Sequence, residues 1–328
     1  MRNNTKTPTK VLVIGGAGYI GSTVARQLWD QGYDVTVLDS LLFGDDALKP
    51  LLNQPRFTLI EGDIRDEAIL AKIVPGHDAV CLLAAIVGEP ACNRDPKEAI
   101  DVNLHGTRKV VQAVQDAGIE RFIFASTCSN YGVSGEDGLV NEQAPLQPIS
   151  TYSETKVTAE GEILAAKSET FHPTILRFST AFGISARMRF DLLVSDFTLA
   201  AQRDGKIVIY GGHLWRPFVH VRDIAAAVQT VIEVDVDIVS GEVFNIGTND
   251  ANVQKIQLAE HVQEHIPNTD IEAIQSNVDP RSYRVDFTKA ANSLDYQPRF
   301  SIEDGIRELH VALEAGQWAD PSAPQYHN

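Results

Sequence analysis

The sequence predicts an α/β fold in which a doubly wound parallel sheet is joined to a smaller, mainly C-terminal lobe. Apolar runs of strand length alternate with helical stretches through the first half of the 328-residue chain, as is typical of a parallel sheet. A glycine-rich segment follows the first apolar run, where such sheets bind nucleotides. The predicted strands are 11–14, 34–38, 57–60, 79–83, 121–125 and 174–178, and the predicted helices are 19–31, 65–73, 96–117 and 152–168.

The first predicted strand and helix are joined by glycines within the segment VLVIGGAGYIG, residues 11–21. Gly15 permits a tight turn, Gly18 lets the backbone approach a pyrophosphate, and Gly21 lets the helix pack close to the strand. The start of the helix offers free N–H groups and a partial positive charge. The segment therefore predicts a dinucleotide site at this helix.

Asp39 ends the second predicted strand, near the distance from the glycines expected of the acidic residue that binds the adenosine ribose. A carboxylate there accepts hydrogen bonds from the two ribose hydroxyls and repels a 2′-phosphate. The alternative is that Asp39 does no more than end its strand. The order strand, glycine loop, helix, strand and acid predicts a Rossmann sheet that binds NAD in preference to NADP.

The chain carries a formal net charge of −16 and no basic cluster, which disfavours nucleic acids and anionic membranes as partners. A phosphate-bearing substrate must then be held by a few local arginines. No apolar stretch is long enough to span a bilayer, and the polar start MRNNTKTPTK does not resemble a signal peptide. The three cysteines have no disulfide or metal-ligand spacing. We therefore expect a cytoplasmic protein without a metal site.

The second half of the chain is less regular, and we expect it to build most of the smaller lobe. We predict that residues 1–178 form the cofactor-binding domain, with 217–247 returning to it, and that 179–216 and 248–328 form the smaller lobe. Residues 316–328, rich in proline, alanine and polar residues, are expected to be a loose tail. Further strands are predicted at 206–211 and 243–247, and further helices at 188–205, 221–235, 254–266 and 302–316.

Tyr152 and Lys156 are four residues apart and share one face of a predicted helix. A phenol has a pKa of about 10 and is a poor base at neutral pH. A nearby ammonium and a positive nicotinamide ring favour the phenolate. The pair can then accept a proton from a substrate hydroxyl while hydride leaves the same carbon. The alternative is a solvated helix face, which is common for this spacing alone.

Small hydroxyl residues, Ser126, Thr127 and Ser129, follow the apolar strand at 121–125. The carboxyl ends of strands are where doubly wound sheets place their sites. A hydroxyl there can hydrogen-bond and polarise the reacting oxygen, and we assign this role to Thr127. The alternative is that these residues only cap the strand end.

On these motifs the chain resembles an extended short-chain dehydrogenase/reductase of the nucleotide-sugar epimerase/dehydratase family, over nearly its whole length. GGAGYIG is similar to the family's cofactor loop, LLAA at 82–85 to its nicotinamide-side strand end, and NLHGT at 103–107 to its NxxGT. Thr127, Tyr152 and Lys156 match its catalytic triad. The resemblance implies that the cofactor is bound by Gly15, Gly18, Tyr19, Ile20, Gly21, Asp39, Asp63, Ile64, Leu83, Ala84, Ala85, Asn103, Tyr152 and Lys156.

Two arginine segments are also similar to the family's. Arg216, in WRPFVHVRD, matches an arginine that holds the diphosphate of the sugar nucleotide, and Arg281, in DPRSYRVD, matches a later phosphate contact. The alternative for each is a surface ion pair. His220 and Asp223 are interpreted as structural. Further predicted substrate contacts are Val87, Thr127, Arg187 and Arg189, although the two arginines could equally form a solvated turn.

The chain also departs from the family pattern. Dehydratases of the family carry Asp-Glu directly after the catalytic threonine, whereas this chain has Cys128 and Ser129 there. The family's usual histidine is Leu82, and Thr180 replaces its usual asparagine. The segment ISARMRFDLLV, residues 184–194, resembles a subgroup that includes enzymes acting on GDP-heptoses.

The predicted function is that of an NAD-dependent nucleotide-sugar 4-epimerase that acts through a transient 4-keto sugar. The alternatives are a 4-dehydrogenase or 4-keto reductase, a 4,6-dehydratase, which the missing acids disfavour, and a non-enzymatic NAD sensor. The helices near 96–117 and 152–168 resemble those of the family's four-helix dimer interface, which predicts a homodimer. Their apolar positions could also serve core packing, and they are Val110, Val111, Val114, Val157 and Leu164.

Overall fold

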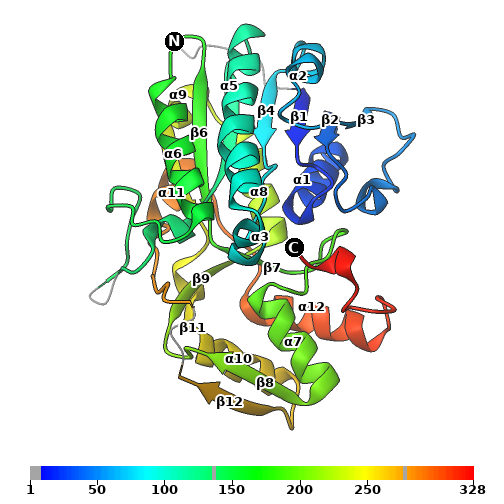
Figure 1. Ribbon diagram of the computed structural model, residues 1–328, viewed down its shortest axis with the longest axis vertical. Helices are drawn as coiled ribbons and strands as arrows, with labels where there is room; N and C mark the ends of the chain where they lie inside the picture. Colours follow the sequence, from blue (N-terminus) through cyan, green and yellow to red (C-terminus); the bar gives the residue numbers. More distant parts are fainter. Residues whose placement is uncertain (1–8, 135–137, 276–278) are drawn as a thin grey trace.

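A seven-stranded parallel sheet forms the larger part of the computed structural model, which describes residues 9–134, 138–275 and 279–328. The strand order is β10-β6-β5-β4-β1-β2-β3, with β4 at the centre (Figure 1). This confirms the predicted fold class. The strands are β1 (Lys10–Ile14), β2 (Asp34–Asp39), β3 (Phe57–Glu61), β4 (Ala79–Leu82), β5 (Arg121–Thr127), β6 (His172–Phe178) and β10 (Glu242–Ile246).

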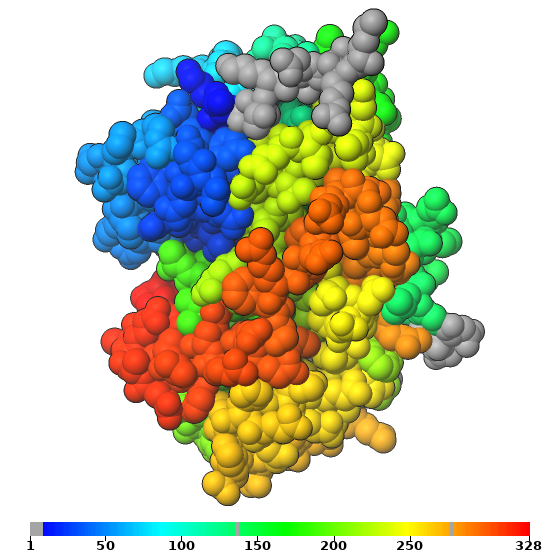
Figure 2. All heavy atoms as spheres, turned by 180° about the vertical axis from the view of Figure 1, so that it is seen from behind, coloured from blue at the N-terminus to red at the C-terminus, as the bar shows by residue number. Residues whose placement is uncertain are grey.

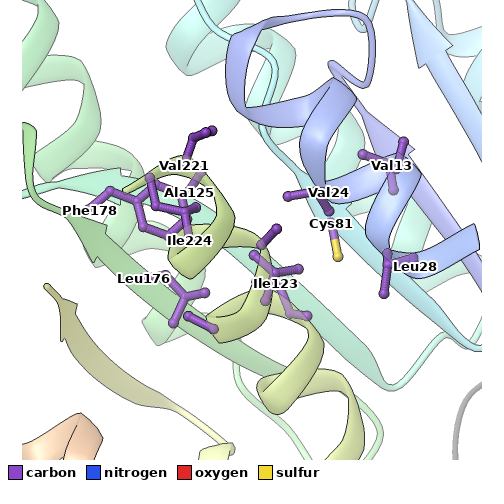
Figure 3. Close-up of a cluster of buried hydrophobic side chains, with 14 of the residues drawn as sticks. Val13, Val24, Leu28, Cys81, Ile123, Ala125, Leu176, Phe178, Val221 and Ile224 are labelled. Atoms are coloured by element: carbon purple, nitrogen blue, oxygen red, sulfur yellow. The ribbon is translucent and has the colours of Figure 1, made fainter. Parts of the chain in front are cut away.

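Helices cover both faces of this sheet, because its central strands are apolar on both sides. One face packs against α1 and α8, and their shared core includes Val13, Val24, Ile123 and Ile224 (Figure 3). The other face packs against α2, α5 and α6, with Leu12 and Phe124 at its centre. These helices are α1 (Tyr19–Asp30), α2 (Glu67–Ile73), α5 (Thr107–Asp116), α6 (Thr151–Ala165) and α8 (Val221–Glu233).

A smaller lobe lies at one end of the sheet, below it in Figure 1. Its helices α7, α10 and α12 enclose a separate core that includes Phe197, Leu258 and Ile306. Two small sheets complete it, with orders β11-β9-β7 and β12-β8. The elements are α7 (Leu193–Asp204), α10 (Lys255–His265), α12 (Ile302–Glu314), β7 (Thr180–Phe182), β8 (Lys206–Tyr210), β9 (Trp215–His220), β11 (Asn252–Gln254) and β12 (Asp270–Ile274).

The remaining short elements connect these parts of the fold. On the sheet side they are α3 (Glu89–Arg94), α4 (Pro96–Ile100), α9 (Val236–Val239) and α11 (Thr288–Leu294). Strand β10 rejoins the sheet beside β6, as expected of the predicted strand at 243–247. The predicted division of the chain into a cofactor-binding domain and a substrate lobe stays a prediction.

Two regions differ from expectation. The stretch 96–117, predicted as one helix, is interrupted by a π-helical turn at Asp101–Gly106, where a Cβ on Gly106 would lie 2.7 Å from Ile64. The segment 316–328 was expected to be loose, but Trp318 and Tyr326 pack edge-on against the ring of Phe190. Figures 1 and 2 show this segment, in red, lying against the smaller lobe.

The outer face of α5 and α6 bears on the predicted homodimer. Val110 and Val114 are fully buried in the core of the monomer, so they cannot contribute to a dimer interface as expected. Val111 and Leu164 are only partly buried, and an ion pair between Arg108 and Glu162 links the two helices on the outside. Within the described residues, no helix has the length and apolarity needed to cross a membrane.

Candidate active site

A cleft of about 1100 Å³ opens at the carboxyl ends of the sheet strands and extends to the smaller lobe. Asn103, a predicted cofactor contact, does not line it. Its amide is buried behind the wall, where it accepts from the Ile86 N–H and donates to the Ile86 carbonyl. The other predicted residues line the cleft: Gly15, Gly18, Tyr19, Ile20, Gly21, Asp39, Asp63, Ile64, Leu83, Ala84, Ala85, Val87, Thr127, Tyr152, Lys156, Arg187, Arg189, Arg216 and Arg281.

The glycine loop connects β1 to the first turn of α1. Gly15 has a φ of +88°, and a Cβ there would lie 2.5 Å from the Ala84 backbone nitrogen. A Cβ on Gly21 would lie 2.0 Å from the Gly15 carbonyl oxygen, so only glycine permits this helix to start so close to the strand. A Cβ on Gly18 would meet only that same oxygen, at 3.4 Å. The loop therefore presents bare backbone to the cleft at a helix N-terminus, which fits the pyrophosphate of a dinucleotide.

Asp39 lies at the end of β2, on the wall beside this loop. Its carboxylate accepts hydrogen bonds of 2.9 Å from the Ala17 N–H and from the Leu41 N–H. Burial raises the pKa of Asp39, and the two backbone hydrogen bonds oppose this rise. Each carboxylate oxygen still has a second acceptor site, so the group fits a pair of ribose hydroxyls.

The Asp63 carboxylate, predicted to contact the cofactor, is already hydrogen-bonded by Arg65. Its two oxygens accept from the Arg65 side chain at 3.0 and 2.6 Å, and these bonds hold its pKa below the usual range. Arg65 in turn pairs with Glu98 and Asp101. The Asp63 side chain thus braces the cleft wall through this network, and its neighbour Ile64 supplies an apolar surface there.

Three predicted catalytic side chains come from β5 and α6. Thr127 is at the last position of β5, and its hydroxyl lies 2.7 Å from the Ser129 hydroxyl. Lys156 is 2% exposed, donates to the Ala125 carbonyl at 2.8 Å, and has its Nζ 6.0 Å from the ring centroid of Tyr152. The helix begins with a capping box at Ser150 and Ser153, which fixes its first turn and hence Tyr152.

Burial has the largest influence on the ionisation of Tyr152 and Lys156. Burial raises the pKa of the Tyr152 phenol, and the charges of Arg189 and Arg281 oppose the rise. Burial also lowers the pKa of the Lys156 ammonium to about 8, against the charge of Glu160. In the protein alone, burial therefore opposes the phenolate, and the joint effect of Lys156 and a nicotinamide ring on the pKa of Tyr152 stays a prediction. The phenolate depends on further positive charge in the cleft.

A buried polar network that the sequence did not reveal lies behind Thr127. Glu160 pairs with Arg177 at 2.7 Å, and the two side chains are 3% and 5% exposed. Glu160 also accepts from Ser126 and, at 2.9 Å, from Asn130. Arg177 donates to the Tyr131 hydroxyl at 2.9 Å. The spacing of Glu160 one turn after Lys156 was the available signal, because it places both on the inner face of α6.

The two predicted diphosphate arginines meet on one carboxylate. Arg216, 3% exposed on β9, and Arg281 donate to Asp279 at 2.7 Å each. Lys255 lies 3.8 Å from the same carboxylate, and burial with the charges of Arg216 and Arg281 lowers its pKa. We call these four residues the Asp279 cluster. It carries more positive than negative charge, which suits a diphosphate. The role of Asp279 could not be predicted, because no local sequence pattern marks an acid that bridges two arginines.

The remaining predicted arginines form a second group on a loop before α7. Arg189 grips both oxygens of Asp191, at 3.0 Å from Nε to Oδ1, and its hydrogen bonds outweigh burial to lower the pKa of that carboxyl. Arg187 lies over the ring of Phe43, with its Cζ 3.9 Å from the ring centroid. Neither arginine is on a solvated turn, since they are 9% and 6% exposed. Phe43 and His327 also line the cleft, and neither was predicted as a site residue.

The three cysteines, Cys81, Cys92 and Cys128, are buried free thiols. Cys128 is buried and its thiol donates to the Arg177 carbonyl, while burial raises its pKa to about 12. Cys92 is buried and lies near the Ile86 carbonyl. In the part of the chain that the structure describes, no group of three or more His, Cys, Asp or Glu residues could hold a metal ion.

Comparison with known proteins identifies the chemistry of this cleft. The model of the NAD dependent epimerase/dehydratase family matches residues 11–247. The chain is 31% identical over 318 residues to the UDP-glucose 4-epimerase of Lactobacillus helveticus, covering 90% of this chain and 94% of the relative.

Two solved structures are similar over nearly the whole chain. The UDP-glucose 4-epimerase of Thermotoga maritima, solved with UDP-glucose, has a TM-score of 0.83 and 28% identity, covering 94% of this chain and 100% of its own. The dTDP-glucose 4,6-dehydratase of Streptomyces venezuelae, solved with NAD, has a TM-score of 0.83 and 27% identity, covering 95% and 99%. The chain therefore belongs to the NAD dependent epimerase/dehydratase family and is an NAD-dependent enzyme that modifies nucleotide sugars.

Proposed function

We propose that the enzyme is a nucleotide-sugar 4-epimerase. The observation that carries this proposal is the pair of residues after Thr127. Cys128 is a buried thiol with a pKa raised to about 12, and Ser129 is engaged with the Thr127 hydroxyl. Neither can act as the acid or base that elimination of water needs at neutral pH. Thr127, Tyr152 and Lys156, the residues proposed to interconvert an alcohol and a ketone, are therefore not accompanied by the additional acids of a dehydratase.

The proposed roles of these residues follow from their positions. Bound NAD supplies the hydride acceptor and donor. Tyr152 takes the proton of the C4 hydroxyl, and Thr127 hydrogen-bonds the same oxygen. Lys156 is held against the Ala125 carbonyl, where its charge favours the phenolate and its side chain can contact the nicotinamide ribose.

Inversion at C4 requires the sugar to present both faces while it stays bound. The Asp279 cluster fits this requirement because it anchors a diphosphate away from the ring. Arg216 is fixed by Asp279 and by the carbonyls of Trp215 and Arg281. A rigid anchor at one end and a wide cleft at the other permit the 4-keto ring to turn without release. Arg216 and Arg281 are thus proposed as diphosphate contacts.

The experiment that tests the proposal uses a nucleotide sugar labelled with deuterium at C4. The NAD-loaded enzyme is incubated with UDP-, GDP- and dTDP-hexoses, and products are identified by NMR and mass spectrometry. An epimerase converts one hexose to its C4 epimer with the label retained and without net NADH. A product lighter by two hydrogens with NADH accumulating would instead identify a 4-dehydrogenase, and loss of water a dehydratase. The GDP sugars in this screen also test the resemblance to GDP-heptose enzymes.

We also propose that the enzyme is a homodimer through α5 and α6. The support is the partly exposed apolar side chains of Val111 and Leu164 on adjacent helices. The buried Val110 and Val114 reduce the apolar surface available, so the interface would include the Arg108–Glu162 pair. Light scattering at several protein concentrations tests this, and a monomer at all of them would contradict it.

A further inference from the structure

Arg187 forms no ion pair with an acidic side chain among the residues that the structure describes, although it lines the cleft and is only 6% exposed. The other arginines of the cleft wall each pair with an aspartate, and they are Arg65, Arg189, Arg216 and Arg281. A buried cation without a counter-ion is costly, so Arg187 points to an anion that the chain itself does not provide.

The guanidinium of Arg187 has two nitrogens that make no hydrogen bond within the described chain. Nη2 donates to the His327 carbonyl at 3.1 Å, whereas Nη1 has no partner and Nε is buried without one. Burial and the charge of Arg189 lower the pKa of Arg187 to about 10, so the group remains charged at neutral pH. The guanidinium can therefore donate further hydrogen bonds to an oxyanion in the cleft.

The Arg187 loop, residues 183–192, is fastened to the start of α1. The Ser185 hydroxyl donates to the Tyr19 carbonyl at 2.6 Å, and the Tyr19 hydroxyl donates to the Gly183 carbonyl at 2.6 Å. Tyr19 is the first residue of α1 and directly follows the glycine loop. The Arg187 loop thus lies against the helix N-terminus that fits a pyrophosphate.

Phe43 contacts Arg187 from the strand that carries the ribose-binding carboxylate. The Arg187 Cζ lies 3.9 Å from the centroid of the Phe43 ring. Phe43 follows Asp39 closely in the chain, and the Asp39 carboxylate accepts from the Ala17 N–H of the glycine loop at 2.9 Å. Arg187 therefore lies between a loop fastened to α1 and a loop that begins at Asp39. In a bound dinucleotide, the pyrophosphate joins these two parts of the site.

A short segment near the end of the chain positions the guanidinium. The Phe190 N–H donates to the Tyr326 carbonyl at 2.9 Å, and the two rings pack edge-on. These contacts bring the neighbouring His327 carbonyl to Arg187. In Figure 1 the chain end, marked C, lies between α1 and the smaller lobe. Arg187 is thus oriented before a ligand binds, which reduces the entropy lost on binding.

The charges of the cleft distinguish the cofactor from the substrate as the source of the anion. The glycine segment 15–21 contains no basic residue, and the nearby Arg65 is engaged by Asp63. A pyrophosphate held by this segment would otherwise meet only backbone N–H groups. The diphosphate of the substrate is already provided for by the Asp279 cluster, which has more cations than acids. The uncompensated charge of Arg187 therefore suits the cofactor.

We propose that Arg187 binds the pyrophosphate of NAD, so that a side chain from outside the glycine loop helps to retain the cofactor. The sequence had suggested a substrate contact for this residue. Retention matters because the same NAD must accept a hydride and return it before it leaves the protein. A cofactor contact by Arg187 is nevertheless independent of the reaction that the enzyme performs on the sugar.

The test compares ligands that contain the pyrophosphate with a ligand that lacks it. The probes are NAD, ADP-ribose and adenosine at the cofactor site, and UDP at the substrate site of the NAD-loaded enzyme. Calorimetry gives dissociation constants, NMR titration serves for adenosine, and exchange of isotope-labelled NAD gives its release rate. Arg187→Gln should weaken NAD and ADP-ribose by about 10- to 100-fold, the worth of a charge-assisted hydrogen bond, and speed NAD release similarly. The affinities for adenosine and UDP should not change.

Three further variants make the comparison specific. Arg281→Gln removes a cation of the Asp279 cluster, so it should weaken UDP and leave ADP-ribose unchanged. Arg203→Gln removes an exposed arginine on α7 that pairs with Asp204, and it should affect no ligand and leave the melting temperature unchanged. Arg187→Lys keeps the charge but loses the planar fork. It should therefore lose less affinity than Arg187→Gln, and it provides the same comparison if that variant folds poorly.

Each result separates the cofactor pyrophosphate from another role of Arg187. Losses for NAD and ADP-ribose alone support the proposal, whatever reaction the enzyme performs. An equal loss for adenosine would overturn it, because Arg187 would then support the loop without binding phosphate. A loss confined to UDP would assign Arg187 to the sugar nucleotide, and unchanged NAD affinity and release would show that it does not retain the cofactor. Tighter binding of NADP than NAD, with a loss confined to NADP, would assign it to the 2′-phosphate and equally refute the proposal.

Discussion

The cofactor side and the substrate side of the cleft are built differently. On the cofactor side, one contiguous stretch from Gly15 to Asp39 supplies the loop, the helix start and the carboxylate, and Asp39 is held by backbone N–H groups. On the substrate side, Arg189, Arg216 and Arg281 come from segments far apart in the chain, and carboxylates hold them.

This difference separates recognition by shape from recognition by charge. The glycine loop can approach a pyrophosphate because it carries no side chains. This steric requirement is local, so the sequence pattern alone predicts it. The arginine groups can bind anions because several cations are buried close together. Each arginine depends on hydrogen-bond partners that only the tertiary fold brings near. Burial amplifies both attraction and the cost of an unpaired charge. Substitutions should therefore have different signatures on the two sides.

The largest expected effect is on the reaction itself, where the two sides meet. Tyr152→Phe removes the group that accepts the C4 proton, and turnover should fall about 10²- to 10⁴-fold. The change deletes one oxygen on a half-buried side chain, so cofactor content and melting temperature should stay close to those of the wild type. Turnover is measured by C4-epimer formation and bound NAD by its release on denaturation. Near-normal turnover would refute the role of Tyr152.

The buried pair behind Thr127 gives the largest expected loss of stability. Glu160→Ala leaves Arg177 charged and buried without its partner, and the free energy of unfolding should fall by about 3–5 kcal/mol. Glu162→Ala, two residues later on the outer surface of α6, removes an exposed carboxylate and serves as the matched control. Urea unfolding measures both. If the free energy of unfolding falls by a similar amount in both variants, burial does not account for the contribution of Glu160 to stability.

Lys156 offers a test by pH. Its pKa of about 8 in the folded chain lies below the usual 10.5, so between these values the unfolded chain binds more protons. Stability contributed by this group therefore rises with pH over that window, by up to about 3 kcal/mol in all. Relative to Lys156→Met, the wild type should gain stability from pH 8 to 10.5 in urea titrations. A difference between the two proteins that is constant with pH would show that burial does not shift this ammonium.

The sequence predicted the cofactor side in more detail than the substrate side, for physical reasons. The strands 11–14 and 34–38 are local and apolar, and the structure places them at β1 and β2. By contrast, the strands β7, β11 and β12 have three to five residues and pair with distant segments, so they leave no periodic signal. Asn103 shows the limit of a motif, because its amide braces the Ile86 backbone from behind the cleft wall. The roles of Asp279 and His327 depend wholly on tertiary contacts.

Asp39 tests recognition on the cofactor side. Asp39→Asn removes the charge that repels a 2′-phosphate and weakens the bonds to ribose, so NAD affinity should fall about 10- to 100-fold and NADP should lose less or gain. Asp63→Asn is the matched control, because its carboxylate is already engaged by Arg65. Fluorescence titration with both cofactors measures the ratio. An unchanged preference for NAD in Asp39→Asn would contradict the assignment of this carboxylate to the ribose.

The smallest expected effect concerns an arginine–carboxylate pair outside the cleft. Arg108 and Glu162 have good geometry, but their side chains are 45% and 42% exposed. Arg108→Ala should therefore lower the stability of a monomer by less than about 1 kcal/mol, because water screens the pair. The same change in the proposed homodimer would leave Glu162 unpaired in an interface, and the melting temperature would then fall more at low protein concentration. A small loss that is independent of concentration would contradict the dimer interface on α5 and α6. Such a result would also show that an exposed arginine pair contributes less energy than the arginines of the cleft, whose interactions are strengthened by burial.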